Sequence, residues 1–123
     1  MAYILSVGKS IPPNQMPQDA TVEFAKELFE GTFKDINRLL PVFKNGDIES
    51  RQFVKNMDWY TSKHSFEDKN NTYIEAAVTL GTEAIVNCLT AKQFLKRDIG
   101  CEEIDAIFFI SSTGISTPSI DAK

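Results

Sequence analysis

The sequence is poor in the residues that disulfide frameworks and most metal sites need. Its 123 residues include one histidine, His64, and two cysteines, Cys88 and Cys101, which are far apart in the chain. Two single cysteines form neither a disulfide framework nor a metal-binding pair, and His64 has no His or Cys at ligand spacing. We therefore expect no metal site, a structural or surface role for His64, and reduced thiols in a cytoplasmic protein. We also expect no cofactor.

The chain also lacks a basic block and a long apolar run. Thirteen Lys and Arg stand against 17 Asp and Glu, for a net charge of −4, which disfavours binding to a nucleic-acid backbone. No apolar run approaches the ~20 residues that span a bilayer, and the first residues do not resemble a secretory signal. With 42% hydrophobic and 24% charged residues, the composition is typical of one folded, soluble domain with a hydrophobic core.

The common catalytic motifs are missing too. The sequence contains neither a glycine-rich phosphate loop nor a Gly-x-Ser-x-Gly motif. Cys88 falls on an apolar helical face, where a thiol acts as a small hydrophobe, and the glutamates after Cys101 disfavour a thiolate. We interpret the acidic pairs Glu67–Asp68 and Glu102–Glu103 as helix-starting residues, and Trp59–Tyr60 as packing aromatics.

The first half of the chain predicts a strand, a connector and two helices. The apolar residues 3–7 stop at Gly8, as a buried strand does, and three prolines within residues 11–17 indicate a connector. Residues 22–29 have helical spacing, with Asp19 as N-cap and Gly31 as the end.

A second short helix is expected over residues 35–40, ended or bent by Pro41. Asn45–Gly46 then marks a turn, and residues 48–54 are expected to be extended or irregular.

The second half predicts a long helix followed by a buried strand. Ser65 and Asp68 have capping-box spacing, and a broad apolar face continues to about residue 96. The apolar residues 104–110 are typical of a strand buried on both faces. At its carboxyl end, where α/β sheets bind ligands, lie four candidate binding residues: Ser111, Ser112, Thr113 and Gly114. The predicted class is α/β, with sheet strands and a long buried central helix.

The C-terminal segment, residues 104–121, resembles the chalcone-synthase-like type III polyketide synthases, in particular the bacterial ones. In that family an apolar strand runs into a Ser/Thr triplet, a Gly, and then a Pro and an Asp at this spacing. Three further motifs occur in matching order: Ile4-x-x-Val7-Gly8 with its Pro-Pro segment, Ile48-x-x-Arg51, and Asn70-x-x-Tyr73 at the start of an Ala-rich helix. The resemblance covers the whole chain.

This resemblance implies a thiolase fold and an acyltransferase. Such enzymes load an acyl group from coenzyme A onto a cysteine, extend it with malonyl-CoA and cyclise the product to pyrones or phenols. The coenzyme A thioesters are substrates, and the enzymes are homodimers. The family's Cys, His and Asn would all lie beyond Lys123, so we expect residues 1–123 to be an incomplete N-terminal part of a thiolase-fold domain that is inactive alone.

A few site residues are carried over from the family. Ser112 and Thr113 match positions that line the active-site cavity, within the Ser111 to Gly114 loop. Thr117 matches a position that reaches across the dimer interface, where plant members carry Met. Arg38, with Lys44 nearby, matches part of the basic cluster that binds coenzyme A phosphates in plant members, whereas Pro41 and Asn45 replace other basic positions.

Two other functions stay open at this stage. One is a relative of ketoacyl-carrier-protein synthases or hydroxymethylglutaryl-CoA synthases, which share the fold. The other is a non-catalytic interaction module that docks a partner on an exposed apolar face. The starter acyl group, the number of extensions and the cyclisation mode cannot be read from these residues.

Overall fold

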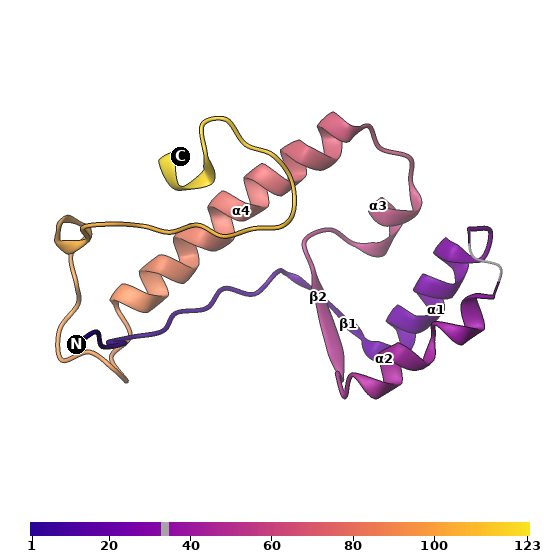
Figure 1. The fold of residues 1–123 in the computed structure, drawn as a ribbon, viewed down its shortest axis with the longest axis horizontal. Helices are drawn as coiled ribbons and strands as arrows, with labels where there is room; N and C mark the ends of the chain where they lie inside the picture. The colour runs from indigo at the N-terminus through magenta and orange to yellow at the C-terminus, as the bar shows by residue number, and fades with distance from the viewer. Residues whose placement is uncertain (33–34) are drawn as a thin grey trace. The chain divides into compact units, whose positions relative to one another are not determined.

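The computed structural model describes residues 1–32 and 35–123, apart from the side chain of Lys44. The chain divides into two compact units, one made of residues 1–11 and 64–123 and the other of residues 12–63 (Figure 1). Helices and strands both occur, as the predicted mixed class requires. In the described part no helix is both long enough and apolar enough to cross a membrane.

A two-stranded antiparallel ribbon anchors the unit of residues 12–63. Strand β1 (Asn14–Pro17) pairs with β2 (Ser50–Phe53), so that Asn14 lies opposite Phe53 and Pro17 opposite Ser50. The prediction of a connector over residues 11–17 is therefore wrong for its second half. Proline lacks an amide proton, but Pro17 stands at the strand end, and residues 14–16 keep theirs. Strand β2 shows that residues 50–53 of the segment expected to be extended or irregular are extended.

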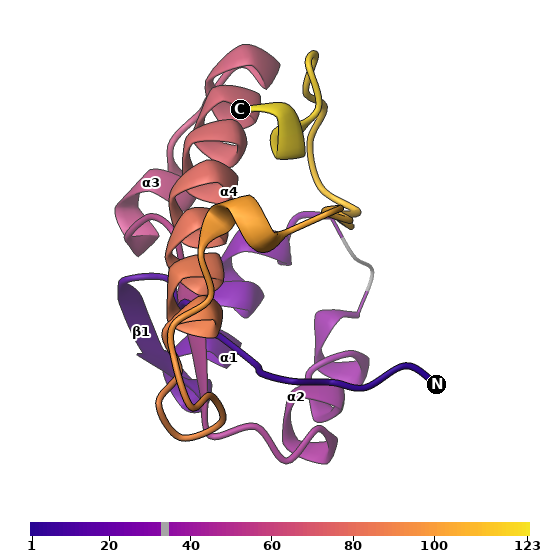
Figure 2. The same cartoon turned by 90° about the vertical axis from the view of Figure 1, so that its left-hand side faces the viewer.

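Three helices follow β1 in this unit, and the first of them, α1, contacts both strands. Helix α1 (Gln18–Phe29) confirms the first predicted helix, although Pro17 and not Asp19 is its N-cap residue. A short 3-10 helix, η1 (Ile36–Arg38), precedes α2 (Pro41–Asn45). Pro41 thus begins a helix where we expected it to end one, because proline's fixed φ suits the first helical position. Figure 2 shows α1 following directly from β1.

Aromatic rings gather on helix α3 (Met57–Thr61), still within the unit of residues 12–63. The Tyr60 ring meets Trp59 at 5.0 Å, Phe53 at 5.7 Å and Phe24 at 6.5 Å between centroids, all edge to face. The edge of one ring carries partial positive charge and meets the negative face of another. The prediction that Trp59–Tyr60 packs is confirmed.

Helix α4 (Phe66–Leu89), with 24 residues, is the longest described element of the unit of residues 1–11 and 64–123 (Figure 1). Its capping box is confirmed, since the Asp68 amide donates to the Ser65 hydroxyl at 3.0 Å and the Ser65 amide donates back to the Asp68 carboxylate at 3.2 Å. The helix ends at Leu89, short of the predicted end near residue 96. There the chain turns back, and the Ile99 amide donates to the Leu89 carbonyl at 3.0 Å.

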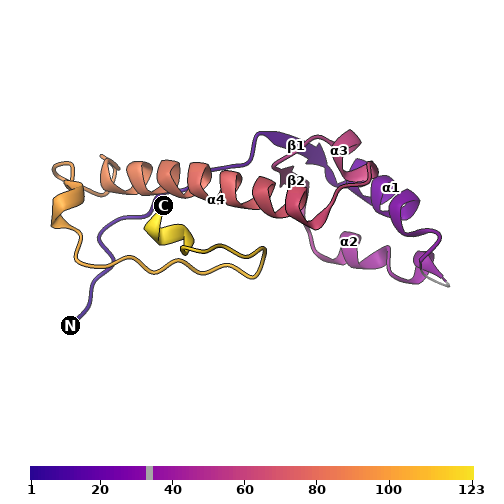
Figure 3. The ribbon, with the colours of Figure 1, turned by 90° about the horizontal axis from the view of Figure 1, so that it is seen from above.

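The N-terminal segment lies along α4 as an extended chain (Figures 1 and 3). The Ser6 hydroxyl donates to the Cys88 carbonyl at 2.7 Å, and the side-chain amide of Asn87 donates to the Lys9 carbonyl at 3.0 Å. Gly8 sits so close to the helix that an added Cβ would overlap the Ala84 carbonyl and lie 2.7 Å from Cys88 Cα. Small and polar residues therefore face the helix.

The prediction of a buried strand over residues 3–7 is wrong. No strand includes these residues, and the side chains of Tyr3 and Ile4 are 74% and 89% exposed. The same holds for residues 104–110, where Phe108 is 89% and Ile110 93% exposed. An apolar run becomes a buried strand only when neighbouring strands and a covering layer are present, and the described residues supply neither for these two runs.

The hydrophobic core is correspondingly small. Within the described part only Thr21, Ala25, Ile36 and Ala91 are buried. Residues of the predicted apolar face of α4, such as Tyr73, Ala77 and Cys88, are half-buried. Helix α4 is long, as expected, but the expectation that it is buried is not met, because none of its residues is fully buried.

Candidate functional site

The predicted binding loop folds back onto the N-terminal half of α4. Asn70 holds it with both polar atoms of its side chain: the amide nitrogen donates to the Ile115 carbonyl at 2.8 Å, and the amide oxygen accepts from the Ile115 amide at 2.8 Å. The side chain thus pairs with Ile115 as a neighbouring strand would. Residues 111–117 are placed by this helix and not by a sheet.

Gly114 makes the second contact between this loop and α4. Its φ is +73°, in the left-handed region that glycine adopts without cost. A Cβ at this position would overlap the ring of the half-buried Tyr73. Glycine is therefore required here for its backbone conformation and for its lack of a side chain.

The loop presents hydroxyl groups to solvent. The Ser111 hydroxyl bonds within the loop, accepting from the Thr113 amide at 3.2 Å and donating to the Thr113 carbonyl at 3.1 Å. The side chains of Ser112, Thr113 and Thr117 are exposed. Residues 111–118 contain no Asp, Glu, His, Lys or Cys, so the loop can hydrogen-bond a ligand but has no group suited to acid–base catalysis.

An apolar cavity lies between α4 and the segment that leads to the loop. Its volume is about 370 Å³, and Ile85, Cys88 and Leu89 line it from α4 while Cys101, Ile104 and Phe108 line it from the other side. Cys88 is half-buried and Cys101 exposed, and both are free thiols. The lining suits an apolar group or further side chains of polypeptide.

The acidic pairs serve helix starts, as predicted. Asp68 closes the capping box of α4, and its pKa lies below its usual value because the Ser65 hydroxyl and amide donate to it, with a smaller effect of the His64 charge. Glu103 lies in the 3-10 helix η2 (Cys101–Glu103). Two hydrogen bonds from Arg97, at 2.7 and 2.6 Å, and one from the Gly100 amide lower the pKa of Glu103 to about 2.

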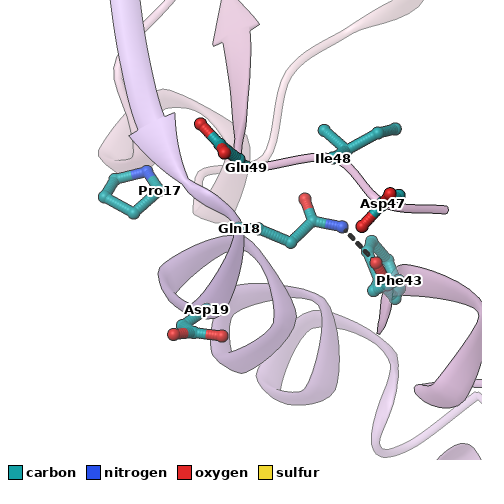
Figure 4. A pocket seen from close by; sticks show the side chains of 7 residues that line it. All are labelled: Pro17, Gln18, Asp19, Phe43, Asp47, Ile48 and Glu49. Atoms are coloured by element: carbon teal, nitrogen blue, oxygen red, sulfur yellow. Dashed lines mark hydrogen bonds between the residues drawn. The ribbon is translucent and has the colours of Figure 1, made fainter. Parts of the chain in front are cut away.

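The predicted coenzyme A contacts belong to the other unit. Arg38 ends η1 and is exposed, and Lys44 lies in α2 with its side chain outside the described part. That unit also holds an open pocket of about 510 Å³, shown in Figure 4, where the side-chain amide of Gln18 donates to the Phe43 carbonyl at 2.8 Å. The carboxylates of Asp19, Asp47 and Glu49 line this pocket and disfavour a phosphate inside it.

Arg51 of the Ile48-x-x-Arg51 motif has a structural role within the same unit. Its Nε donates to the Gln18 side chain at 3.1 Å, and its guanidinium lies 5.4 Å from the centroid of the Phe43 ring. These contacts tie β2 to the start of α1 and to α2.

Among the described residues, no three His, Cys, Asp or Glu side chains are grouped so as to hold a metal ion.

Sequence reasoning missed the role of Asn70 and Tyr73 toward the loop. It placed both residues at the start of the long helix and treated Tyr73 as part of the apolar face. Their spacing of three residues does put them on one side of a helix, and a polar Asn beside an apolar face was the available signal. The loop partner itself lies 45 residues away, which local patterns cannot identify.

Comparison with known proteins adds one relative. No family model matches the chain. The chain is 50% identical over all 123 residues to a Bacillus subtilis (strain 168) protein named "Putative chalcone synthase". It spans 34% of the length of that relative. The resemblance to chalcone-synthase-like proteins drawn from the sequence motifs is thereby confirmed.

Proposed function

We propose that this chain is the N-terminal part of a type III polyketide synthase, an acyltransferase that condenses acyl-CoA starters with malonyl-CoA into pyrones or phenols. The observation that carries the proposal is the 50% identity to the Bacillus subtilis relative over the whole length of this chain. The thiolase fold, the cytoplasmic location and the homodimeric state are parts of the same proposal.

In this proposal the chain supplies walls of the active site and not its nucleophile. The loop Ser111–Gly114 lines the cavity through its hydroxyls, and Thr117 reaches toward the second subunit. Arg38 and Lys44 contact the phosphates of coenzyme A, since guanidinium and ammonium groups pair with phosphate oxygens. Cys88 and Cys101 have no part in acyl transfer.

The exposed apolar segments support the proposal. Residues 3–7 and 104–110 carry large apolar side chains that are 40–93% exposed, and contiguous apolar surface of this kind marks sites that another polypeptide covers. We infer that the remaining two thirds of the synthase cover these segments and fill the apolar cavity on α4.

Assay of two purified proteins tests the function. The longest natural polypeptide that contains this sequence is incubated with acyl-CoA starters and labelled malonyl-CoA, and residues 1–123 alone serve as the matched control. We expect labelled pyrones or phenols, identified by mass spectrometry, from the longer protein and none from the control. Product from residues 1–123, with acyl adducts on Cys88 or Cys101, would contradict the assignment of the nucleophile.

The same assay separates the alternatives. A ketoacyl-carrier-protein synthase relative would use malonyl groups on a carrier protein, and a hydroxymethylglutaryl-CoA synthase relative would use acetyl-CoA without decarboxylation. A non-catalytic module would consume none of these thioesters. Any of these outcomes for the longer protein would overturn the proposed function.

A further inference from the structure

We propose that Asn70 and Tyr73 of α4 are positioning residues that set the shape of the cavity-wall loop 111–117. The structural part stands on the contacts of these residues alone. The catalytic part, that they thereby influence which product forms, rests on the proposed function.

Asn70 fixes the loop at a single residue, Ile115. Its carboxamide satisfies both the N–H and the C=O of Ile115, each at 2.8 Å. A side-chain amide is planar like a peptide group, so two hydrogen bonds to one residue define both the position and the orientation of the loop backbone. Without this side chain, the Ile115 amide and carbonyl would lose these two hydrogen bonds and would bond to water instead.

Tyr73 fixes the loop one residue earlier. Its ring occupies the space that a side chain on residue 114 would need, and Gly114 takes a φ of +73° against it. Asn70 and Tyr73 are one turn apart on α4, a helix of 24 residues whose first turn the capping box fixes. The loop therefore rests on two neighbouring side chains of a rigid element.

Asn70 and Tyr73 together form a clamp on residues 114 and 115, and exposed hydroxyl groups lie on either side of it. Ser112 and Thr113 precede the clamped residues, and Thr117 follows them, so their positions depend on how Gly114 and Ile115 are held. In a cavity whose walls guide chain extension, small shifts of such groups alter which intermediate cyclises or leaves. Asn70 and Tyr73 then influence the product without contacting it.

The test uses Asn70→Ala in the longest natural polypeptide, with Asn71→Ala as matched control because Asn71 is the exposed neighbour on the same helix. The first readout is hydrogen exchange at the Ile115 amide. We expect about tenfold faster exchange in Asn70→Ala, which loses both hydrogen bonds to Ile115, and no change in Asn71→Ala. Equal exchange rates in Asn70→Ala and the unchanged protein would overturn the clamp.

The second readout is the ratio of polyketide products of different chain length. A loss of folded protein lowers all products together, whereas a displaced loop changes their ratio. We expect the ratio to change by about threefold or more in Asn70→Ala, with the KM for malonyl-CoA within about twofold. An unchanged ratio, in a variant whose Ile115 exchange has accelerated, would overturn the catalytic part.

A conservative variant keeps the test decisive if Asn70→Ala does not fold. Asn70→Asp has nearly the same size, but its carboxylate only accepts hydrogen bonds and sets an oxygen against the Ile115 carbonyl, where two acceptors repel. We therefore expect faster exchange at the Ile115 amide than in the unchanged protein. If the unchanged protein makes no polyketide, the proposed function fails, and the exchange measurement still decides whether Asn70 holds the loop.

Discussion

Asn70 and Ile115 lie 45 residues apart, yet the Asn70 side chain forms hydrogen bonds with both the N–H and the C=O of the Ile115 backbone. The contact joins the start of a long helix to the loop that the family resemblance places in a catalytic cavity. It also explains why the loop is ordered without a sheet beside it.

Gly8→Ala should release the N-terminal segment from α4. The added Cβ would overlap the Ala84 carbonyl and lie 2.7 Å from Cys88 Cα, and backbone atoms inside a helix cannot move aside. We expect faster amide exchange at residues 6–10 and a lower melting temperature. Gly81→Ala is the control, because a Cβ there meets nothing within 4 Å and alanine favours the helix by about 1 kcal/mol. A melting temperature that Gly8→Ala leaves unchanged would contradict the close packing.

Ser65→Ala should weaken the start of α4. Removal of an N-cap hydroxyl costs about 1 kcal/mol of stability, measured by denaturant unfolding followed by circular dichroism. The same change should raise the pKa of Asp68 toward 3.8, because the Ser65 hydroxyl is the main cause of its lowering. Thr79→Ala, at an exposed position inside the helix, should leave the Asp68 titration unchanged. An equal effect of both substitutions would argue against the capping box.

Glu103 should titrate near pH 2, and Arg97→Gln should raise its pKa toward 4.5. Because the pKa is lowered in the folded chain, the stabilisation is present above pH 4.5 and is lost as the pH falls toward about 2. The carboxylate is exposed, so solvent screens this contribution to stability. Carboxyl NMR titration measures the pKa, and Lys92→Gln, which removes the separate Lys92–Asp98 pair, serves as control. A Glu103 midpoint near 4.5 in the unchanged chain would rule out the pairing.

Tyr60→Ala should loosen the unit of residues 12–63. Tyr60 meets three other rings, and each aromatic pair contributes about 0.5–1.5 kcal/mol beyond area burial. Trp59 is the single tryptophan of the sequence, so its fluorescence reports on this cluster directly. We expect the Trp59 emission to shift to the red in Tyr60→Ala relative to the unchanged chain. We expect no shift in Tyr3→Ala, because the Tyr3 side chain is 74% exposed. An unshifted Tyr60→Ala spectrum would mean that the rings do not pack.

Local sequence was sufficient for elements whose causes are local. The capping box at Ser65 and Asp68, the periodic apolar residues of α1 and α4, and the extended residues around β2 all follow from neighbours within a few positions. The motifs around residues 104–121 were also sufficient to identify the resemblance that the Bacillus subtilis relative confirms. Each of these features depends on residues that are close together in the sequence.

Tertiary structure alone decided the features that depend on distant partners. Residues 3–7 and 104–110 have the composition of buried strands, but a strand needs neighbours for its backbone hydrogen bonds, and the described chain provides none for them. The segment at residues 14–17 is a strand, despite its proline, because β2 is there to pair with it. The placement of the binding loop depends on Asn70 and Tyr73 for the same reason: sequence specifies which groups are available, and only the folded chain decides which of them meet.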